Sequence, residues 1–110
     1  MGREMTDYIQ IITTTETEQD AQAIATALVE RGLAACVQIV GPIRSTYRWK
    51  EKIETAQEWQ CVAKTRRELF ERVEEALKSL HPYEVPEILA VSIVAASQSY
   101  GRWIDEQVTL

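Results

Sequence analysis

The fold is decided by residues 34–64, AACVQIVGPIRSTYRWKEKIETAQEWQCVAK. β-Branched and aromatic residues flank Lys50-Glu51 on both sides, which favours two strands, 34–49 and 52–64, joined by a tight turn. The Asn-Gly pair that is typical of such turns is absent. Gly41-Pro42 predicts a bend in the first strand, because proline cannot donate a hydrogen bond to a central ladder. This stretch therefore predicts one long, bent β-hairpin.

The segments around the hairpin alternate between strand and helix patterns. Residues 8–14 and 88–95 are rich in apolar and β-branched residues, as strands are. Two helices are predicted between them and the hairpin, each opened by a capping box, Thr15 with Glu18 and Thr65 with Glu68. Gly32 is expected to end the first of these helices, and Leu80 is the last residue of the second. A short amphipathic helix at 97–106 closes the chain, with Tyr100, Trp103 and Ile104 as its apolar side.

The predicted order is β-α-β-β-α-β plus a C-terminal helix. This order is typical of the ferredoxin-like α+β fold, an antiparallel four-stranded sheet with two helices on one face. The sequence shows no linker and no low-complexity segment. We therefore expect a single domain over residues 1–110, of which 1–6 form a disordered N-terminal tail.

The length of the hairpin predicts self-association. About sixteen strand residues at about 3.3 Å each span roughly 50 Å. A compact domain of this size is only roughly 35 Å across, so the hairpin should project beyond its own core. A projecting hairpin that carries Tyr47, Trp49 and Trp59 needs a partner to cover its edge and its aromatic rings. A closed homo-oligomer supplies that cover most simply.

The composition argues against several classes of partner. The chain has 12 basic and 17 acidic residues and a net charge of −5, whereas a nucleic-acid-binding protein usually has a basic face. No apolar run approaches the 18 or so residues of a membrane span, and no secretory signal is visible. Cys36 and Cys61 lie in apolar contexts without metal-ligand spacing, as free thiols of a cytoplasmic protein do. We expect a cytoplasmic protein that binds neither nucleic acid nor a membrane.

Residues 81–87, HPYEVPE, hold the only histidine of the chain. Two prolines make the segment extended. His81, Tyr83 and Glu87 are residue types that bind metals or move protons. His81 has a structural alternative, because a histidine at a helix C-terminus hydrogen-bonds the carbonyls of the last turn. Acid–base catalysis is a weaker alternative, since no nucleophile–base pair and no phosphate-binding loop accompany these residues.

Five blocks of this sequence resemble the CutA divalent-cation-tolerance family over about residues 7–108. They are LAACV (33–37), STYRW (45–49), KT (64–65), HPYEVPEI (81–88) and Tyr100 with Trp103-Ile104. The resemblance implies a ferredoxin-like homotrimer, similar in architecture to the PII signalling trimers, with the long hairpins at the subunit interfaces. It also implies a non-enzymatic role in the tolerance of divalent metals, copper above all. Two positions depart from the family pattern: Thr13 stands where some members have a cysteine, and Glu51 replaces the usual hairpin glycine.

The candidate site residues fall into two groups. His81 and Glu87 are the expected ligands of a weak site for copper(II) or another divalent cation, completed across a subunit interface; no cofactor is expected to be obligatory. The second group is expected to line a ligand cleft or to pack at an interface: Lys64, Tyr83, Tyr47, Trp49, Trp59 and Trp103. The alternative function is a PII-like trimeric sensor that binds a small anion or nucleotide in inter-subunit clefts. A basic cluster would serve that function or instead form solvated or inter-subunit salt bridges: Arg44, Arg48, Lys50, Lys64, Arg66 and Arg67.

Overall fold

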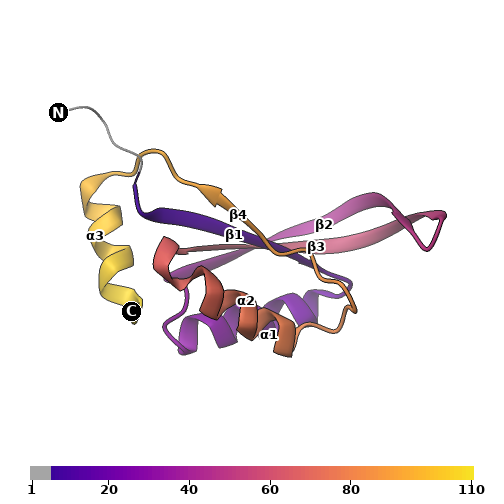
Figure 1. Cartoon of the computed structure of the whole chain (residues 1–110), viewed down its shortest axis with the longest axis horizontal. Helices are drawn as coiled ribbons and strands as arrows, with labels where there is room; N and C mark the ends of the chain where they lie inside the picture. The colour runs from indigo at the N-terminus through magenta and orange to yellow at the C-terminus, as the bar shows by residue number, and fades with distance from the viewer. Residues whose placement is uncertain (1–5) are drawn as a thin grey trace.

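The computed structural model describes residues 6–110 and confirms the predicted order of elements (Figure 1). The elements are β1 (Tyr8–Thr15), α1 (Glu18–Glu30), β2 (Cys36–Trp49), β3 (Lys52–Arg66), a 3-10 turn η1 (Arg67–Leu69), α2 (Phe70–Leu80), β4 (Leu89–Ser92) and α3 (Gln98–Gln107). Residues 1–5 of the predicted N-terminal tail lie outside the described residues, whereas the hydroxyl of Thr6 donates a hydrogen bond to the carbonyl of Ile93. No helix within residues 6–110 is both long and apolar enough to cross a membrane.

The four strands form one antiparallel sheet in the order β2-β3-β1-β4. Helices α1 and α2 lie together on one face of this sheet, and α3 lies at the end opposite the hairpin tip (Figure 1). This arrangement is the ferredoxin-like α+β fold that the sequence predicts. It leaves the other face of the sheet, and both edge strands, uncovered by α1 and α2.

The core lies between the sheet and the two helices. Alternate residues of the central strands, among them Ile11 and Cys61, are 1% exposed on the face toward α1 and α2. The helices meet them with Leu28, Val73 and Leu77, which are also almost fully buried. Burying a side chain of this size contributes about 1.5–3 kcal/mol each. The helices are thus held to the sheet by apolar burial.

The end of α1 is the one that the sequence predicts. Gly32 has φ +68°, a conformation that glycine adopts without strain. Its N–H donates to the carbonyl of Val29 at 3.0 Å, and the N–H of Leu33 donates to the carbonyl of Leu28 at 2.9 Å. This pair of bonds is a Schellman motif, which satisfies the last carbonyls of the helix.

Both predicted capping boxes are wrong as helix starts, whereas α3 begins where it is expected, with Ser97 as its N-cap. The N-cap of α1 is Thr17, whose side chain accepts from the N–H of Asp20, while the hydroxyl of Thr15 donates to the carbonyl of Thr17 at 2.8 Å. Thr65 is a residue of β3, and α2 begins only at Phe70. The reason is tertiary: pairing with β1 continues to the end of β3 and draws Thr65 into the ladder opposite Ile9.

The last strand is shorter than predicted. Residues 88–95 are expected to form it, but β4 covers only Leu89–Ser92 and pairs with four residues of β1. It is an edge strand, and Leu89 and Val91 remain 53% and 47% exposed. Beyond it the N–H of Ile93 still donates to the carbonyl of Tyr8 at 3.1 Å, and the chain then leaves the sheet toward α3.

The long hairpin has the predicted bend and the predicted projection. The pairing of β2 with β3 shifts register between Val40 and Ile43, at Gly41-Pro42. The molecule measures 50 × 30 × 23 Å, and the far part of the hairpin extends beyond the helices that cover the rest of the sheet (Figure 1). The hairpin therefore carries its side chains away from the core of its own domain.

The hairpin tip predicts a stabilising substitution. Lys50 and Glu51 both have positive φ, +50° and +68°, as a type I′ turn requires. A non-glycine residue in this conformation is strained, so Glu51→Gly should raise the free energy of unfolding by about 0.5–1 kcal/mol. Chemical denaturation of the two proteins measures the difference. Glu54→Gly, inside β3, is the control and should destabilise instead.

Candidate functional site

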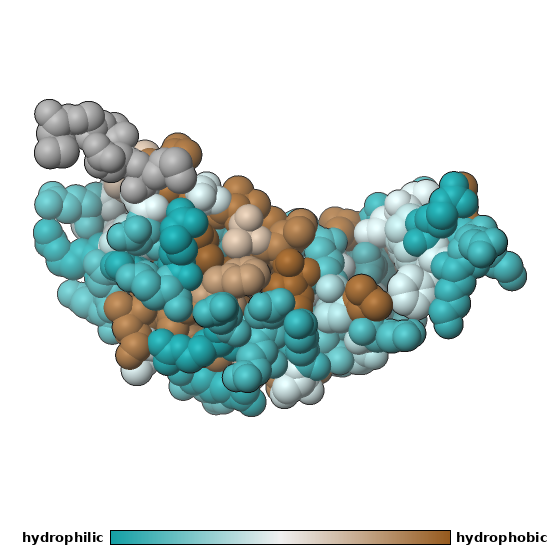
Figure 2. Space-filling model, in the orientation of Figure 1, coloured by the Kyte–Doolittle hydropathy of each residue, from teal (hydrophilic) through white to brown (hydrophobic). Residues whose placement is uncertain are grey.

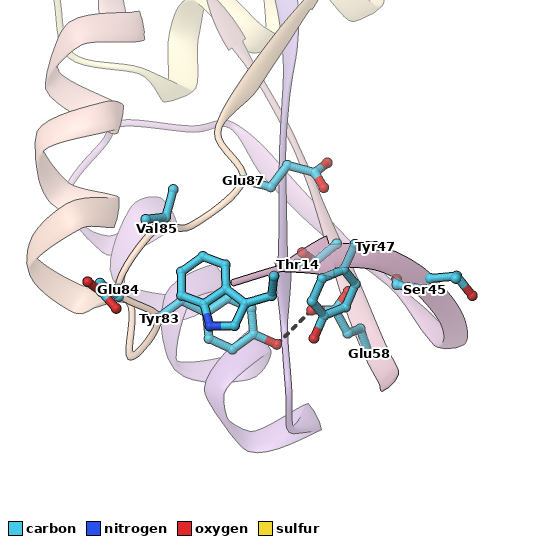
Figure 3. Close-up of a pocket in the computed structure, with 10 residues that line it drawn as sticks. Thr14, Ser45, Tyr47, Glu58, Tyr83, Glu84, Val85 and Glu87 are labelled. Atoms are coloured by element: carbon cyan, nitrogen blue, oxygen red, sulfur yellow. Dashed lines mark hydrogen bonds between the residues drawn. The ribbon is translucent and has the colours of Figure 1, made fainter. Parts of the chain in front are cut away.

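A cavity of about 430 Å³ lies at the base of the projecting part of the hairpin (Figure 3). Three elements and one loop contribute its lining. The lining residues are Thr14 of β1, Ser45, Thr46, Tyr47 and Trp49 of β2, Glu58 of β3, and Tyr83, Glu84, Val85 and Glu87 of the loop before β4. Strand alternation places Glu58 on the sheet face away from α1 and α2, because Cys61 faces the core. The lining combines three aromatic rings with three carboxylates and contains no lysine or arginine.

Glu58 and Tyr83 form the polar centre of this cavity. The Tyr83 hydroxyl donates to Oε2 of Glu58 at 2.6 Å, and Figure 3 shows Tyr47 beside the pair. Glu58 is only 6% exposed. Burial, followed by the hydrogen bond and charge of Glu58, raises the pKa of Tyr83 above its usual value. The hydroxyl therefore stays protonated and acts as a donor to the carboxylate.

His81 holds the start of the loop in place. Its backbone N–H donates to the carbonyl of Leu77 at 2.8 Å and ends α2. Its Nε2 lies 2.7 Å from the carbonyl oxygen of Thr14, and the N–H of Tyr83 donates to its Nδ1 at 3.1 Å. A carbonyl only accepts, so Nε2 carries the proton and the ring is neutral. The alternative structural role predicted for His81 has its side chain bonded to carbonyls in the last turn of α2. The imidazole ring instead bonds to the carbonyl of Thr14 in β1.

This arrangement leaves His81 without a nitrogen lone pair for a metal. One nitrogen is protonated and the other accepts a backbone N–H. His81 is 8% exposed and does not line the cavity that Glu87 lines. Within residues 6–110 no group of three or more His, Cys, Asp or Glu side chains is placed to hold a metal ion. The structure therefore does not bring the two predicted ligands together into a site within one chain.

Glu87 lines the cavity with its carboxylate, which has no ion-pair partner among residues 6–110. Partial burial, and then the negative charge of Glu58, raise the pKa of Glu87. Burial disfavours the charged form of any carboxyl, and the charge of Glu58 adds a negative field at this position. A cation would be attracted here, whereas an anion would be repelled.

The predicted aromatic and lysine residues divide between four places. Tyr47, Trp49 and Tyr83 line the cavity. Trp59 packs against the core instead, and Trp103 is a half-exposed residue of α3 beside Tyr100. Lys64 hydrogen-bonds the side chain of Gln38 away from the cavity. The set is therefore not one cleft within this chain.

Sequence analysis missed Glu58, the most buried acidic residue of the cavity. Alternation along the return strand was a usable signal, because Glu58 and Trp59 must face opposite sides of the sheet. The sequence alone does not show that the 81–87 loop lies over the sheet face away from α1 and α2. The contact with Tyr83 is what marks Glu58 as part of a site.

Arg66, from the predicted basic cluster, serves as an anchor for α3. Its guanidinium pairs with Asp105 of that helix at 2.6 Å and with Glu68 at 3.0 Å, and it lies over the ring of Tyr8. The hydrogen bond from Arg66 is the main cause that lowers the pKa of Asp105. The salt bridges of this residue, at the end of β3, form within the chain, and the predicted bridges between subunits remain a prediction.

Thr13, at the position where some CutA proteins have cysteine, is a core residue. It is 2% exposed, and its Oγ1 is a buried polar atom without a hydrogen-bond partner in the part of the chain that the structure describes. An unsatisfied buried hydroxyl costs about 1–3 kcal/mol. We expect Thr13→Val, which has the same shape, to raise the free energy of unfolding by about 1 kcal/mol. Thr65→Val removes a hydroxyl that bonds to Leu33 at 2.7 Å, so in denaturant titrations it should destabilise.

Comparison with known proteins identifies the family. The family described as CutA1 divalent ion tolerance protein matches residues 9–107, most of the chain. The chain belongs to the CutA family. A CutA divalent-cation tolerance protein of Thermus thermophilus is 42% identical over 96 residues, which cover 87% of this chain and 93% of that protein. The CutA of Archaeoglobus fulgidus is 42% identical over 90 residues, 82% of this chain and 87% of its own.

Solved CutA structures share the fold described above. The CutA of Synechococcus elongatus has a TM-score of 0.91 at 40% identity, over 96% of this chain and 94% of that chain. This agreement extends the family resemblance from sequence motifs to the whole ferredoxin-like architecture, hairpin included. The CutA family is associated by name with divalent cations, while the cavity described here owes its negative field to Glu58 and Glu87.

Proposed function

We propose that this CutA-family chain works as a homotrimer in the response to divalent cations and catalyses no reaction. The family match over residues 9–107 carries the proposal. The relatives from Thermus thermophilus and Archaeoglobus fulgidus are named divalent-cation tolerance proteins. Cys36 and Cys61 are both unpaired, which favours the reducing cytoplasm as the place of action.

Exposed apolar residues support the assembly. Leu89 and Val91 of the β4 edge are 53% and 47% exposed, and Val94 beyond it is 65% exposed. Figure 2 shows apolar surface along the concave side of the molecule, where α1 and α2 do not lie. An unpaired strand edge with apolar side chains pairs readily with another chain. The projecting hairpin offers a second edge of the same kind.

A matched pair of substitutions tests the assembly. Val91 on β4 and Val29 on α1 are similarly exposed, 47% and 45%. Val91→Asp should place a charge in the interface and dissociate the trimer at micromolar concentration, because a buried unpaired charge is costly. Val29→Asp should leave it intact. Light scattering measures the molar mass; a monomeric parent protein, or equal effects of the two variants, would contradict the proposal.

We propose that the metal interaction is weak binding of copper(II) through carboxylate oxygens, Glu87 among them. Copper(II) binds strongly to almost any set of nitrogen and oxygen ligands, so an exposed carboxylate in a negative field suffices for weak affinity. His81 is not included, because both its nitrogens are hydrogen-bonded. The PII-like alternative has less support, since no lysine or arginine of the described residues 6–110 lines the cavity to receive an anion.

Copper(II) titration of the parent protein, Glu87→Gln and His81→Ala tests this assignment by calorimetry. Glu87→Gln should weaken binding, and His81→Ala should retain it at temperatures where the variant is folded. Electron paramagnetic resonance adds a direct test of the ligands, because an oxygen site lacks nitrogen hyperfine coupling. Loss of binding in His81→Ala alone, with nitrogen coupling in the parent protein, would instead assign the metal to the histidine.

A further inference from the structure

The cavity contains a buried carboxylate whose charge has no counter-charge. Glu58 is 6% exposed and accepts one hydrogen bond, from the neutral hydroxyl of Tyr83 to Oε2. Among residues 6–110, no lysine or arginine lies within ion-pair distance of it. A buried charge is costly unless it is paired and hydrogen-bonded, so an unpaired one at a cavity wall favours a cationic occupant.

The other walls are of the kind that bind organic cations. The aromatic rings of Tyr47, Trp49 and Tyr83 line the cavity, and a cation over the face of such a ring is attracted by its quadrupole. Trp49 already makes one such contact with a residue outside the cavity lining: Nζ of Lys50 lies 5.7 Å from the centroid of its ring. Aromatic walls also provide apolar contact area that a hydrated metal ion does not use.

The size of the cavity distinguishes an organic cation from a bare metal. Its volume of about 430 Å³ falls within the range of about 300–1,000 Å³ that small-molecule sites occupy. A divalent ion held by protein alone needs several oxygen ligands converging on one point. No such group of acidic side chains occurs within residues 6–110.

We infer that this cavity binds a small organic ammonium cation, with Glu58 as its counter-charge and the rings of Tyr47, Trp49 and Tyr83 as its walls. Glu84 and Glu87 at the rim add negative charge that attracts the cation over a longer range. This inference goes beyond the proposed function, since it assigns a different class of ligand and different residues from the copper(II) interaction. Binding should weaken as salt is added, because the rim is open to solvent.

The test uses two cations and a neutral isostere with the purified full-length protein. Choline carries a quaternary ammonium, 1,4-diaminobutane carries primary ammonium groups, and 3,3-dimethylbutan-1-ol has the shape of choline without its charge. We expect at least one of the cations to saturate the protein by calorimetry, with quenching or enhancement of tryptophan fluorescence from Trp49. The neutral alcohol should bind about tenfold or more weakly.

Three variants locate the site. Glu58→Gln keeps an acceptor for Tyr83 but removes the charge, and should weaken cation binding by about tenfold or more. Glu30→Gln removes the same charge from the exposed end of α1 and should change nothing. Tyr47→Ala, at a side chain that is 44% exposed, should fold normally and also weaken binding, which covers the case in which Glu58→Gln fails to fold.

Several results would overturn the inference. If neither cation saturates the protein, the inference is wrong. It is also wrong if Glu58→Gln and Glu30→Gln change cation affinity equally. Saturation by inorganic phosphate or ATP instead of the cations would assign the cavity to an anion. Absence of cation binding, together with a change of molar mass in Glu58→Gln, would show that a basic side chain of a second copy supplies the counter-charge. Loss of copper(II) binding alone would affect the proposed function and not this inference.

Discussion

His81→Ala should lower the free energy of unfolding by about 2–3 kcal/mol. The ring makes two hydrogen bonds at a buried position, one to the carbonyl of Thr14 and one from the N–H of Tyr83. Alanine leaves the carbonyl acceptor and the amide donor without those partners. Thr14 is only 7% exposed, so water does not replace the lost bond freely. Denaturant titration of the parent protein and the variant measures the loss.

The loop also depends on this ring, so the variant should have a second phenotype. Tyr83 is placed both by its N–H bond to His81 and by its hydroxyl bond to Glu58. Hydrogen exchange of the Tyr83 amide should therefore become faster in His81→Ala. His81→Gln, whose amide still offers a donor toward Thr14, should recover part of the stability. Unchanged stability and exchange, combined with loss of metal binding, would contradict the structural role argued here.

Much of the fold was predictable because it depends on local patterns. Apolar alternation gave the strands, the spacing of apolar residues gave the helices, and Gly32 marked the end of α1. The starts of α1 and α2 were not predictable in this way, because pairing with β1 extends β3 through Thr65 and overrides its preference for a cap. The predicted length of β4 was wrong for a related reason, since tertiary contacts decide where an edge strand ends.

The candidate site was less predictable than the fold. The sequence places His81, Tyr83 and Glu87 in one loop, and their proximity along the chain suggested a shared chemical role. In the structure His81 is turned toward β1 while Glu87 lines the cavity. The cavity is completed by Glu58, which is 25 residues away from Tyr83 in sequence. A contact of that separation follows from the sheet topology and not from any local pattern.

Gly41→Ala should destabilise the protein by about 1–3 kcal/mol, through a clash with the ring of Trp59. A Cβ at position 41 would lie 2.6 Å from Cδ1 and 2.9 Å from Cγ of that indole. The ring packs against the core and is not free to swing into solvent. Pairing between β2 and β3 shifts register at this point, so the absence of a side chain is what lets the bent strand approach the indole. Thermal and chemical unfolding would show the loss as a lower midpoint.

A double-mutant cycle separates this clash from a general effect of losing glycine. Trp59→Ala removes Cγ and Cδ1, the ring atoms that the new Cβ would strike, and should itself destabilise, because it leaves a cavity beside the core. If the indole is the cause, Gly41→Ala should cost much less in the Trp59→Ala background, with a coupling of about 0.5–3 kcal/mol. Equal costs in both backgrounds would instead assign the effect to backbone conformation at position 41. Trp59 is predicted to belong to a cleft or interface. The cycle tests whether its indole instead packs against position 41 and so fixes the bend from which the hairpin projects.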